Sequence, residues 1–212
     1  MTVTCVLASA NPHKVSELQS LLGDGPWQLR SLRDYPQCTL PPEVGSTFSA
    51  NACAKAEAVT VATGEWAISD DSGLVVDVLS GAPGIFSARY GGTPTDDAKN
   101  IARLLVDLIN VGPPERSAHF VCVLALARPG VETQWVCGVC SGVVSTCPRG
   151  AGGFGYDPIF YLPALRRTMA ELTAEEKHAI SHRGQAARSL RKMLLDLCRE
   201  KSETSARLGH GA

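Results

Sequence analysis

The sequence predicts an α/β fold built on a long mixed sheet. Its first half alternates short apolar segments with segments whose apolar residues recur at helical spacing, as in parallel strands joined by helices. Its second half has two long apolar segments, 117–127 and 131–146, separated by Pro129-Gly130, which predicts an antiparallel hairpin. Parallel and antiparallel strands together make a mixed sheet. The chain has 212 residues, 44% of them hydrophobic, so it can bury a core, and we assign residues 1–200 to one domain.

The N-terminal elements are marked by boundary residues. Asn11 and Pro12 are residue types preferred at the N-cap and first position of a helix, and Gly23 is a typical helix end. The second predicted helix is rich in Ala, so we expect it to pack closely against its neighbour. The predicted order is a strand at Val3–Ala8, a helix from Asn11 to Gly23, a strand at Trp27–Leu32, a loop at 33–46 and a helix from Thr47 to Thr63.

The later elements follow the same reasoning. Thr95 is the expected N-cap of a third helix, whose first turn carries Asp96 and Asp97, where negative charge suits the helix dipole. The predicted order is strands at Trp66–Ser69 and Leu74–Val78 around an acidic loop, the third helix, the hairpin, a glycine-rich loop at Gly150–Pro158, and helices at Glu171–Lys177 and Arg183–Leu197. Residues 201–212 are small and polar, and we expect them to be a disordered tail.

Composition excludes several classes of protein. Lys and Arg number 20 against 21 Asp and Glu, so the basic excess of a binder of polymeric nucleic acid is absent. The eight cysteines lie mostly among apolar residues, which is typical of reduced thiols, and the lone Cys137-x-x-Cys140 pair lacks the second pair of a zinc site. The sequence has no export signal and no apolar run near the ~20 residues of a membrane span. We therefore expect a soluble, cytoplasmic protein without a membrane segment.

The most informative segment is Ile68-Ser69-Asp70-Asp71-Ser72-Gly73. An apolar strand leads directly into two carboxylates, an arrangement by which α/β proteins hold a divalent metal against phosphates. Asp, Ser and Gly are also the commonest turn formers, so this segment alone is equally compatible with a simple turn.

Two segments could contribute to anion and metal binding. In Ser9-Ala10-Asn11-Pro12-His13-Lys14, a strand gives way to a helix whose free N–H groups and dipole favour an anion. The positive charge of Lys14 in the first turn is unfavourable to the helix dipole, and a phosphate bound there would explain its presence. The alternative is a plain capped helix with an exposed lysine. Glu43 precedes the second helix as either a metal ligand or a solvated loop carboxylate.

Two further segments could contact a base or sugar. Gly152 to Pro158 contains Phe154, whose ring could stack on a base, or could belong to the core. Residues 168–183 carry Lys177 and Arg183, which could meet a phosphate or a carbonyl oxygen, and Ser181, which could cap the last helix; an ordinary charged surface would look similar.

The familiar nucleotide-binding signatures are absent: the chain has no Walker motif and no G-x-G-x-x-G after a strand. Instead it resembles the Ham1/RdgB family of inosine triphosphate pyrophosphatases over residues 3–197. The resemblance rests on five motifs in order, with Ala10 standing where Gly is usual and Ser9 where Thr is common. These motifs are S-A-N-P-H-K, E-V-G-S-T-F-S-A-N-A, S-D-D-S-G-L-V-V-D-V-L-S-G-A-P-G-I-F-S-A-R-Y, G-G-F-G-Y-D-P-I-F and E-E-K-H-A-I-S-H-R-G-Q-A.

The resemblance implies two lobes around an active-site cleft, a homodimer, and Mg²⁺-dependent hydrolysis of ITP, dITP or XTP to the monophosphate and pyrophosphate. It assigns Asp71 to catalysis and, with Glu43, to the metal. It implies that the purine nucleoside triphosphate is bound by Ser9, Ala10, Asn11, Pro12, His13, Lys14, Ser72, Phe154, Gly155, Tyr156, Asp157, Lys177, His182 and Arg183.

Two hypotheses refine this picture. Neighbouring side chains of an extended chain point oppositely, so only Asp71 should face the metal, and Asp70 should support it through hydrogen bonds. Inosine and xanthine carry an acceptor oxygen at position 6 where adenine carries an amino donor. A donor from Arg183, His182 or a loop amide would therefore favour the deaminated bases. Alternatives are a Maf-type nucleotide pyrophosphatase, whose serine-arginine pair near the N-terminus is not seen, and a non-catalytic nucleotide-binding module.

Overall fold

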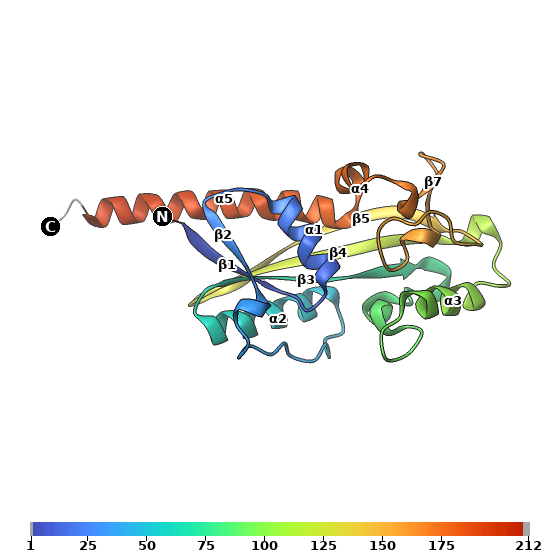
Figure 1. The fold of residues 1–212 in the computed structure, drawn as a ribbon, viewed down its shortest axis with the longest axis horizontal. Coiled ribbons are helices and arrows are strands. Elements are labelled where there is room, and N and C mark those ends of the chain that lie inside the picture. Colours follow the sequence, from blue (N-terminus) through green and yellow to red (C-terminus); the bar gives the residue numbers. More distant parts are fainter. Residues whose placement is uncertain (1, 210–212) are drawn as a thin grey trace.

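A computed structural model describes residues 2–209 of the chain, with side chains up to Glu203. Its elements form an elongated molecule in which the long helix α5 runs beside the sheet and extends beyond it (Figure 1). The helices are α1 (Pro12–Leu22), α2 (Phe48–Thr63), α3 (Asp97–Asp107), α4 (Ala174–Ile180) and α5 (His182–Gly209). The strands are β1 (Val3–Ala8), β2 (Trp27–Ser31), β3 (Trp66–Val76), β4 (Ser117–Arg128), β5 (Val131–Val144), β6 (Phe160–Leu162) and β7 (Arg167–Thr168).

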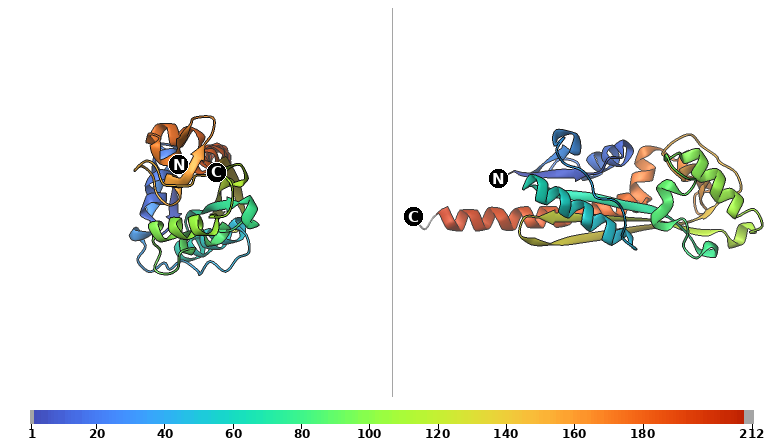
Figure 2. Two further views of the ribbon diagram at one scale, coloured as in Figure 1. Left: turned by 90° about the vertical axis from the view of Figure 1, so that its right-hand side faces the viewer. Right: turned by 90° about the horizontal axis from the view of Figure 1, so that it is seen from below.

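One seven-stranded sheet in the order β2-β1-β3-β4-β5-β6-β7 forms the centre of the fold. β1 is parallel to both β2 and β3, whereas β3, β4, β5, β6 and β7 pair antiparallel in succession. The predicted mixed sheet and the long hairpin are confirmed. Helices α1 and α5 lie on one face and α2 on the other (Figures 1 and 2).

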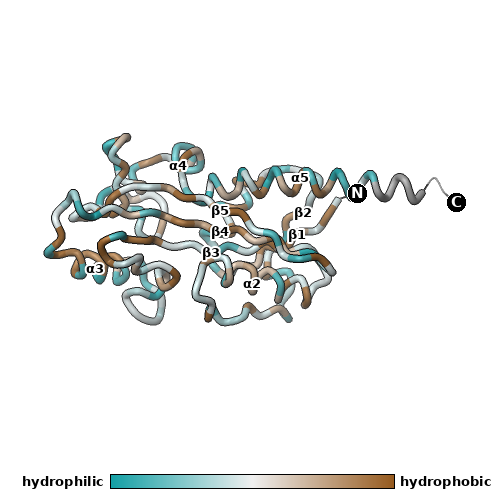
Figure 3. Tube along the Cα trace, turned by 180° about the vertical axis from the view of Figure 1, so that it is seen from behind, coloured by the Kyte–Doolittle hydropathy of each residue, from teal (hydrophilic) through white to brown (hydrophobic). Residues whose placement is uncertain are grey.

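The long central strands connect three hydrophobic clusters. Near β1, Leu190 of α5 packs with Leu124 on one face, while Ala52 and Ala56 of α2 pack with Ala125 on the other. This contact confirms the close packing expected of the Ala-rich helix. At the far end, leucines of α3 pack with β3, β4 and β6 in a separate cluster. Hydrophobic segments follow the central strands along the molecule (Figure 3).

The acidic segment is not a loop. β3 runs without interruption from Trp66 to Val76, and Asp70 and Asp71 pair in register with β4. The predicted break between two strands is wrong because the turn-forming preference of Asp, Ser and Gly is overridden by pairing with the long neighbouring strand.

Other boundaries differ by short distances. Asp96, not Thr95, caps α3, since its Oδ1 accepts a hydrogen bond from the Lys99 N–H at 3.1 Å. α4 begins after the cap residue Thr173 rather than at Glu171, and α5 continues to Gly209. The disordered tail predicted for 201–212 is therefore helical over 201–209, and residues 210–212 lie outside the described residues. Within residues 2–209, no helix is long and apolar enough to cross a membrane.

Candidate active site

The candidate site lies where β1 stops and β3 continues. Ala8 pairs with Ser69 at the end of β1, and β3 then runs on to Val76. The last part of this edge is covered, since Val75 bridges to Pro83 and the Val76 N–H donates to the Ala82 carbonyl, so the edge is open beside Asp70 and Asp71. Asp70 and Asp71 are the first residues past β1. Because successive side chains of a strand alternate, these two carboxylates lie on opposite faces of the sheet. The site therefore has two halves, which meet across the open edge of β3.

Asp70 organises the half that faces α1 and α5. Lys14 Nζ lies 2.5 Å from its Oδ1 and Arg183 Nε lies 2.9 Å from its Oδ2. The Ser72 hydroxyl donates to Oδ1 and the Cys122 thiol to Oδ2. Burial alone would raise the pKa of Asp70, but the charges of Arg183 and Lys14 outweigh it and hold the pKa well below its ordinary value. These contacts show that Asp70 holds the side chains of Lys14 and Arg183 in place. The expected support of Asp71 is not among them.

Glu17, one turn after Lys14 on α1, extends this network toward α4. Its two carboxylate oxygens lie 2.8 Å from Lys177 Nζ and 2.7 Å from Arg183 Nη1. Burial would raise the pKa of Glu17, but the charges of Arg183 and Lys177 lower it below its ordinary value. Lys177 Nζ also lies 2.7 Å from Asp157 Oδ2. The result is a chain of alternating charges that runs through Lys14, Asp70, Arg183, Glu17, Lys177 and Asp157.

A pocket of about 100 Å³ opens beside this chain of charges. Phe154, Tyr156 and Phe120 line it with aromatic rings. The Phe154 ring is stacked on His13, with centroids 5.5 Å apart, and Lys177 Nζ lies 4.7 Å from its centroid. The pocket can accept a flat ring held by aromatic stacking.

The far wall of the pocket comes from α3. Asp97 and Asn100 line it, and Asp97 Oδ2 accepts a hydrogen bond from the Gly155 N–H at 2.7 Å. This bond ties the glycine-rich loop to α3, while the Tyr156 hydroxyl donates to the Ser87 carbonyl. The predicted loop residues Phe154, Gly155, Tyr156 and Asp157 are thus brought together on one pocket.

His182 lies at the inner end of the same pocket. It is 4% exposed and stacked on Phe120, with centroids 4.7 Å apart. Burial and the charge of Arg183 hold the pKa of His182 well below its ordinary value, so the imidazole is neutral. Its Nδ1 has no hydrogen-bond partner among the described residues. Arg183 differs, since its guanidinium donates to Asp70, Glu17 and Ser72.

The other half of the site faces α2. Asp71 Oδ2 accepts a hydrogen bond from Asn51 Nδ2 at 3.1 Å, and Lys55 Nζ lies 3.4 Å from Oδ1. The same Lys55 ammonium lies 2.6 Å from Glu43 Oε1, and Arg89 Nη1 lies 3.4 Å from Glu43 Oε2. Burial raises the pKa of Asp71, and the charge of Glu43 raises it further against the opposing charge of Lys55. Burial acts on Glu43 too, but its hydrogen bond from Lys55 lowers the pKa overall.

Glu43 and Asp71, the two predicted metal ligands, converge on a single ammonium, so their oxygens are spaced to share one cation. Within residues 2–209 no group of three or more His, Cys, Asp or Glu side chains gathers as a metal cage. Two carboxylates are what Mg²⁺ commonly takes from a protein when phosphates and water complete its octahedral shell. The residues present therefore fit Mg²⁺ in the company of a phosphate ligand.

The turn from β1 to α1 differs in one respect from the prediction. Asn11 Oδ1 accepts hydrogen bonds from the N–H groups of His13 and Lys14, and the Asn11 N–H donates to Ser9 Oγ. The expected free N–H groups are therefore already bonded, because Asn11 is an effective side-chain cap. Lys14, which lines the pocket and also faces the open edge of β3, is the residue of this turn that carries a charge for a phosphate.

Comparison with known proteins agrees with this geometry. The model of the Ham1 family matches residues 5–193. The chain belongs to the Ham1 family. It is 48% identical to the dITP/XTP pyrophosphatase of Halalkalibacterium halodurans over 189 residues, which cover 89% of this chain and 97% of that protein. Against a HAM1 protein from Coxiella burnetii of known structure, the TM-score is 0.85 at 42% identity, with 92% of this chain and 100% of that chain covered.

Sequence reasoning assigned no role to three side chains that organise this Ham1 site: Glu17, Asn51 and Lys55. Asn51 and Lys55 are one helical turn apart, and both are more than nine-tenths buried on the Ala-rich helix α2. A lysine on a helix face otherwise lined by alanines is a recognisable signal, because a buried ammonium needs carboxylate partners. Glu17 was recognisable from its spacing, since it lies on the same face of α1 as Lys14.

Proposed function

We propose that this protein hydrolyses the deaminated purine nucleotides dITP, ITP and XTP to their monophosphates and pyrophosphate, clearing them from the nucleotide pool. The observation that carries the proposal is the division of the site by β3. A pocket lined by aromatic rings lies on one face of the strand, and a carboxylate pair suited to Mg²⁺ lies on the other. Lys14 stands between them at the open edge, where a triphosphate chain would cross.

Each half has a distinct chemical task. Lys14 and Ser72 would bind the phosphates, and Glu43 and Asp71 would hold Mg²⁺, which supplies charge neutralisation for phosphoryl transfer. Asp71, to which the family resemblance assigns catalysis, is the group that would accept a proton from the attacking water. Asn51 and Lys55 hold this carboxylate in place through its two oxygens.

The base would be selected at the inner end of the pocket. Of the donors considered, Arg183 and the N–H groups of Phe154 and Gly155 already bond to protein oxygens. Of the three buried side-chain atoms that have no partner among the described residues, His182 Nδ1 is the one that belongs to a residue lining this pocket. As a donor it would pair with the oxygen at position 6 of inosine or xanthine and stay unpaired against the amino group of adenine, which costs binding energy.

Pyrophosphate release tests the proposal directly. With Mg²⁺, the wild-type protein should hydrolyse ITP, dITP and XTP in preference to ATP, and Asp71→Asn should lose nearly all activity. Activity that survives in Asp71→Asn would refute the role of Asp71, and a wild-type protein that binds ITP without hydrolysing it would favour the non-catalytic module. Because the chain belongs to the Ham1 family, the alternative of a Maf-type pyrophosphatase is excluded.

We also propose that the protein is a homodimer. The face of β4 and β5 on the side of α2 carries half-buried and exposed apolar side chains, among them Val139 and Trp135 at 43% and 51% exposure. A second copy of the chain would cover this face. Sedimentation equilibrium should give twice the chain mass of 22.4 kDa, and a monomer at micromolar concentration would contradict the proposal.

The cytoplasm is the compartment that we propose for this activity. All eight cysteines are free thiols, and several are buried in the core, which suits a reducing compartment. Cell fractionation with the pyrophosphatase assay as readout would test this placement.

A further inference from the structure

Lys55 occupies the space between the two carboxylates assigned to the metal. Its Nζ lies 2.6 Å from Glu43 Oε1 and 3.4 Å from Asp71 Oδ1, and it donates to the Asp70 backbone oxygen at 2.8 Å. These three partners use all three donors of the ammonium. The residue is 6% exposed, so water does not compete strongly for these contacts. In the free protein, the carboxylate pair therefore already holds a cation.

The charges around the pair also disfavour an added cation. Arg89 Nη1 lies 3.4 Å from the second oxygen of Glu43. The two carboxylates Glu43 and Asp71 therefore face two cations, Lys55 and Arg89, and the four groups together have no net charge. Like charges a few ångströms apart repel strongly where water is partly excluded. A bare divalent ion would have to displace Lys55 while gaining only two protein ligands.

A metal that arrives on a triphosphate meets a different balance. The phosphates supply oxygens for the metal shell and negative charge for the nearby cations, so Lys55 can exchange its carboxylate partners for phosphate oxygens. We propose that Lys55 is a positioning residue that keeps Glu43 and Asp71 together and closes them to divalent cations until the nucleotide brings the metal. This inference rests on the proposed function, because it assumes a metal–triphosphate substrate.

Mn²⁺ binding, followed by electron paramagnetic resonance of the free ion, tests this inference without turnover. Wild-type protein alone should bind Mn²⁺ at least about tenfold more weakly than protein with the non-hydrolysable α,β-imido analogue of ITP. Lys55→Met, which keeps the length of the side chain and removes its charge, should bind Mn²⁺ alone at least about tenfold more tightly than wild type. Lys55→Arg should stay close to wild type, and Lys55→Met/Asp71→Asn should lose the gained affinity.

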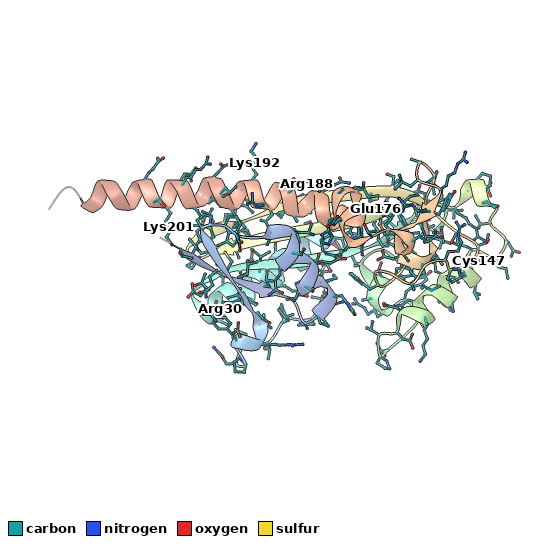
Figure 4. The ribbon with its side chains drawn as sticks, turned by 45° about the horizontal axis from the view of Figure 1, so that its top comes forward. Arg30, Cys147, Glu176, Arg188, Lys192 and Lys201 are labelled. Atoms are coloured by element: carbon teal, nitrogen blue, oxygen red, sulfur yellow. The ribbon has the colours of Figure 1, made fainter. Side chains whose placement is uncertain are left out.

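Lys192→Met provides the matched control, because Lys192 is an exposed lysine on the outer side of α5 (Figure 4). It should leave Mn²⁺ binding unchanged. Wild-type protein that binds Mn²⁺ as tightly alone as with the analogue overturns the inference, whether or not Lys55→Met folds. So does a folded Lys55→Met, judged by its melting temperature, with wild-type Mn²⁺ affinity. Either result leaves ITP hydrolysis by the wild type intact, whereas failure of hydrolysis would refute the function itself.

Discussion

Replacing Asp70 by Asn should destabilise the fold severely. Arg183 is 1% exposed and donates to Asp70 through its Nε, so the substitution leaves a buried guanidinium with only Glu17 as its anionic partner. Removing one member of a buried ion pair costs about 3–5 kcal/mol in the free energy of unfolding. Lys14 adds little to that cost because its side chain is 17% exposed and can turn toward water.

The loss should also depend on pH in a defined direction. Asp70 has an ordinary pKa of 3.8, and its folded pKa lies well below this value. The carboxylate therefore contributes its full stabilisation above about pH 4, and the contribution disappears as the pH falls through the folded pKa. The difference in unfolding free energy between wild type and Asp70→Asn should be constant at neutral pH and shrink as the solution is acidified below about pH 4.

Guanidinium unfolding of both proteins at several pH values measures this difference. The midpoint should fall in the variant with no change in slope, and the melting temperature should drop by about 6–20 °C, taking 2–4 °C per kcal/mol for a chain of this size. Asp24→Asn, at an exposed carboxylate, should change stability by no more than about 0.5 kcal/mol. If Asp70→Asn stays within 1 kcal/mol of wild type at neutral pH, the network does not hold Arg183 as described.

Two further predictions concern substrate turnover. Phe154→Ala should raise KM for ITP by about 5- to 150-fold in steady-state assays, since stacking on a base contributes roughly 1–3 kcal/mol; an unchanged KM would remove Phe154 from the base site. The acid limb of kcat/KM should report an apparent pKa above 3.8 for Asp71, and Asn51→Ala should move it to higher pH, because the Asn51 hydrogen bond lowers this pKa. If Asn51→Ala leaves the acid limb unchanged, the limb reports the titration of a group other than Asp71.

The sequence was sufficient where local signals and packing agree. Asn11 and Gly23 begin and end α1 as their residue types require, and Ser181 caps α5 by accepting a hydrogen bond from the Gly184 N–H. The hairpin follows from two long apolar segments around Pro129-Gly130. Each of these features depends on neighbours within a few residues, and short-range rules describe such neighbours well.

The sequence was insufficient where a residue's partner is far along the chain. Asp70 and Asp71 look like a turn until β4, about fifty residues later, pairs with them. Glu17 looks like a surface residue of α1 until Lys177 and Arg183 reach it from the far end of the chain. The family motifs identified most of the site because they record such long-range contacts indirectly. They did not indicate that the carboxylate pair already holds Lys55.

The balance of charge in the site explains why a metal belongs to this chemistry. Each cation near the open edge of β3 already has a carboxylate partner: Lys14, Lys55, Arg89, Lys177 and Arg183 are paired with Asp70, Glu43 or Glu17. Asp71 and Asp157 add two further carboxylates, so the five cations face five anions. A triphosphate brings about four negative charges, which such a neutral site cannot offset by itself. A cation that enters with the nucleotide would offset them, and it would also free Lys14 and Lys55 to turn from their carboxylates toward phosphate oxygens.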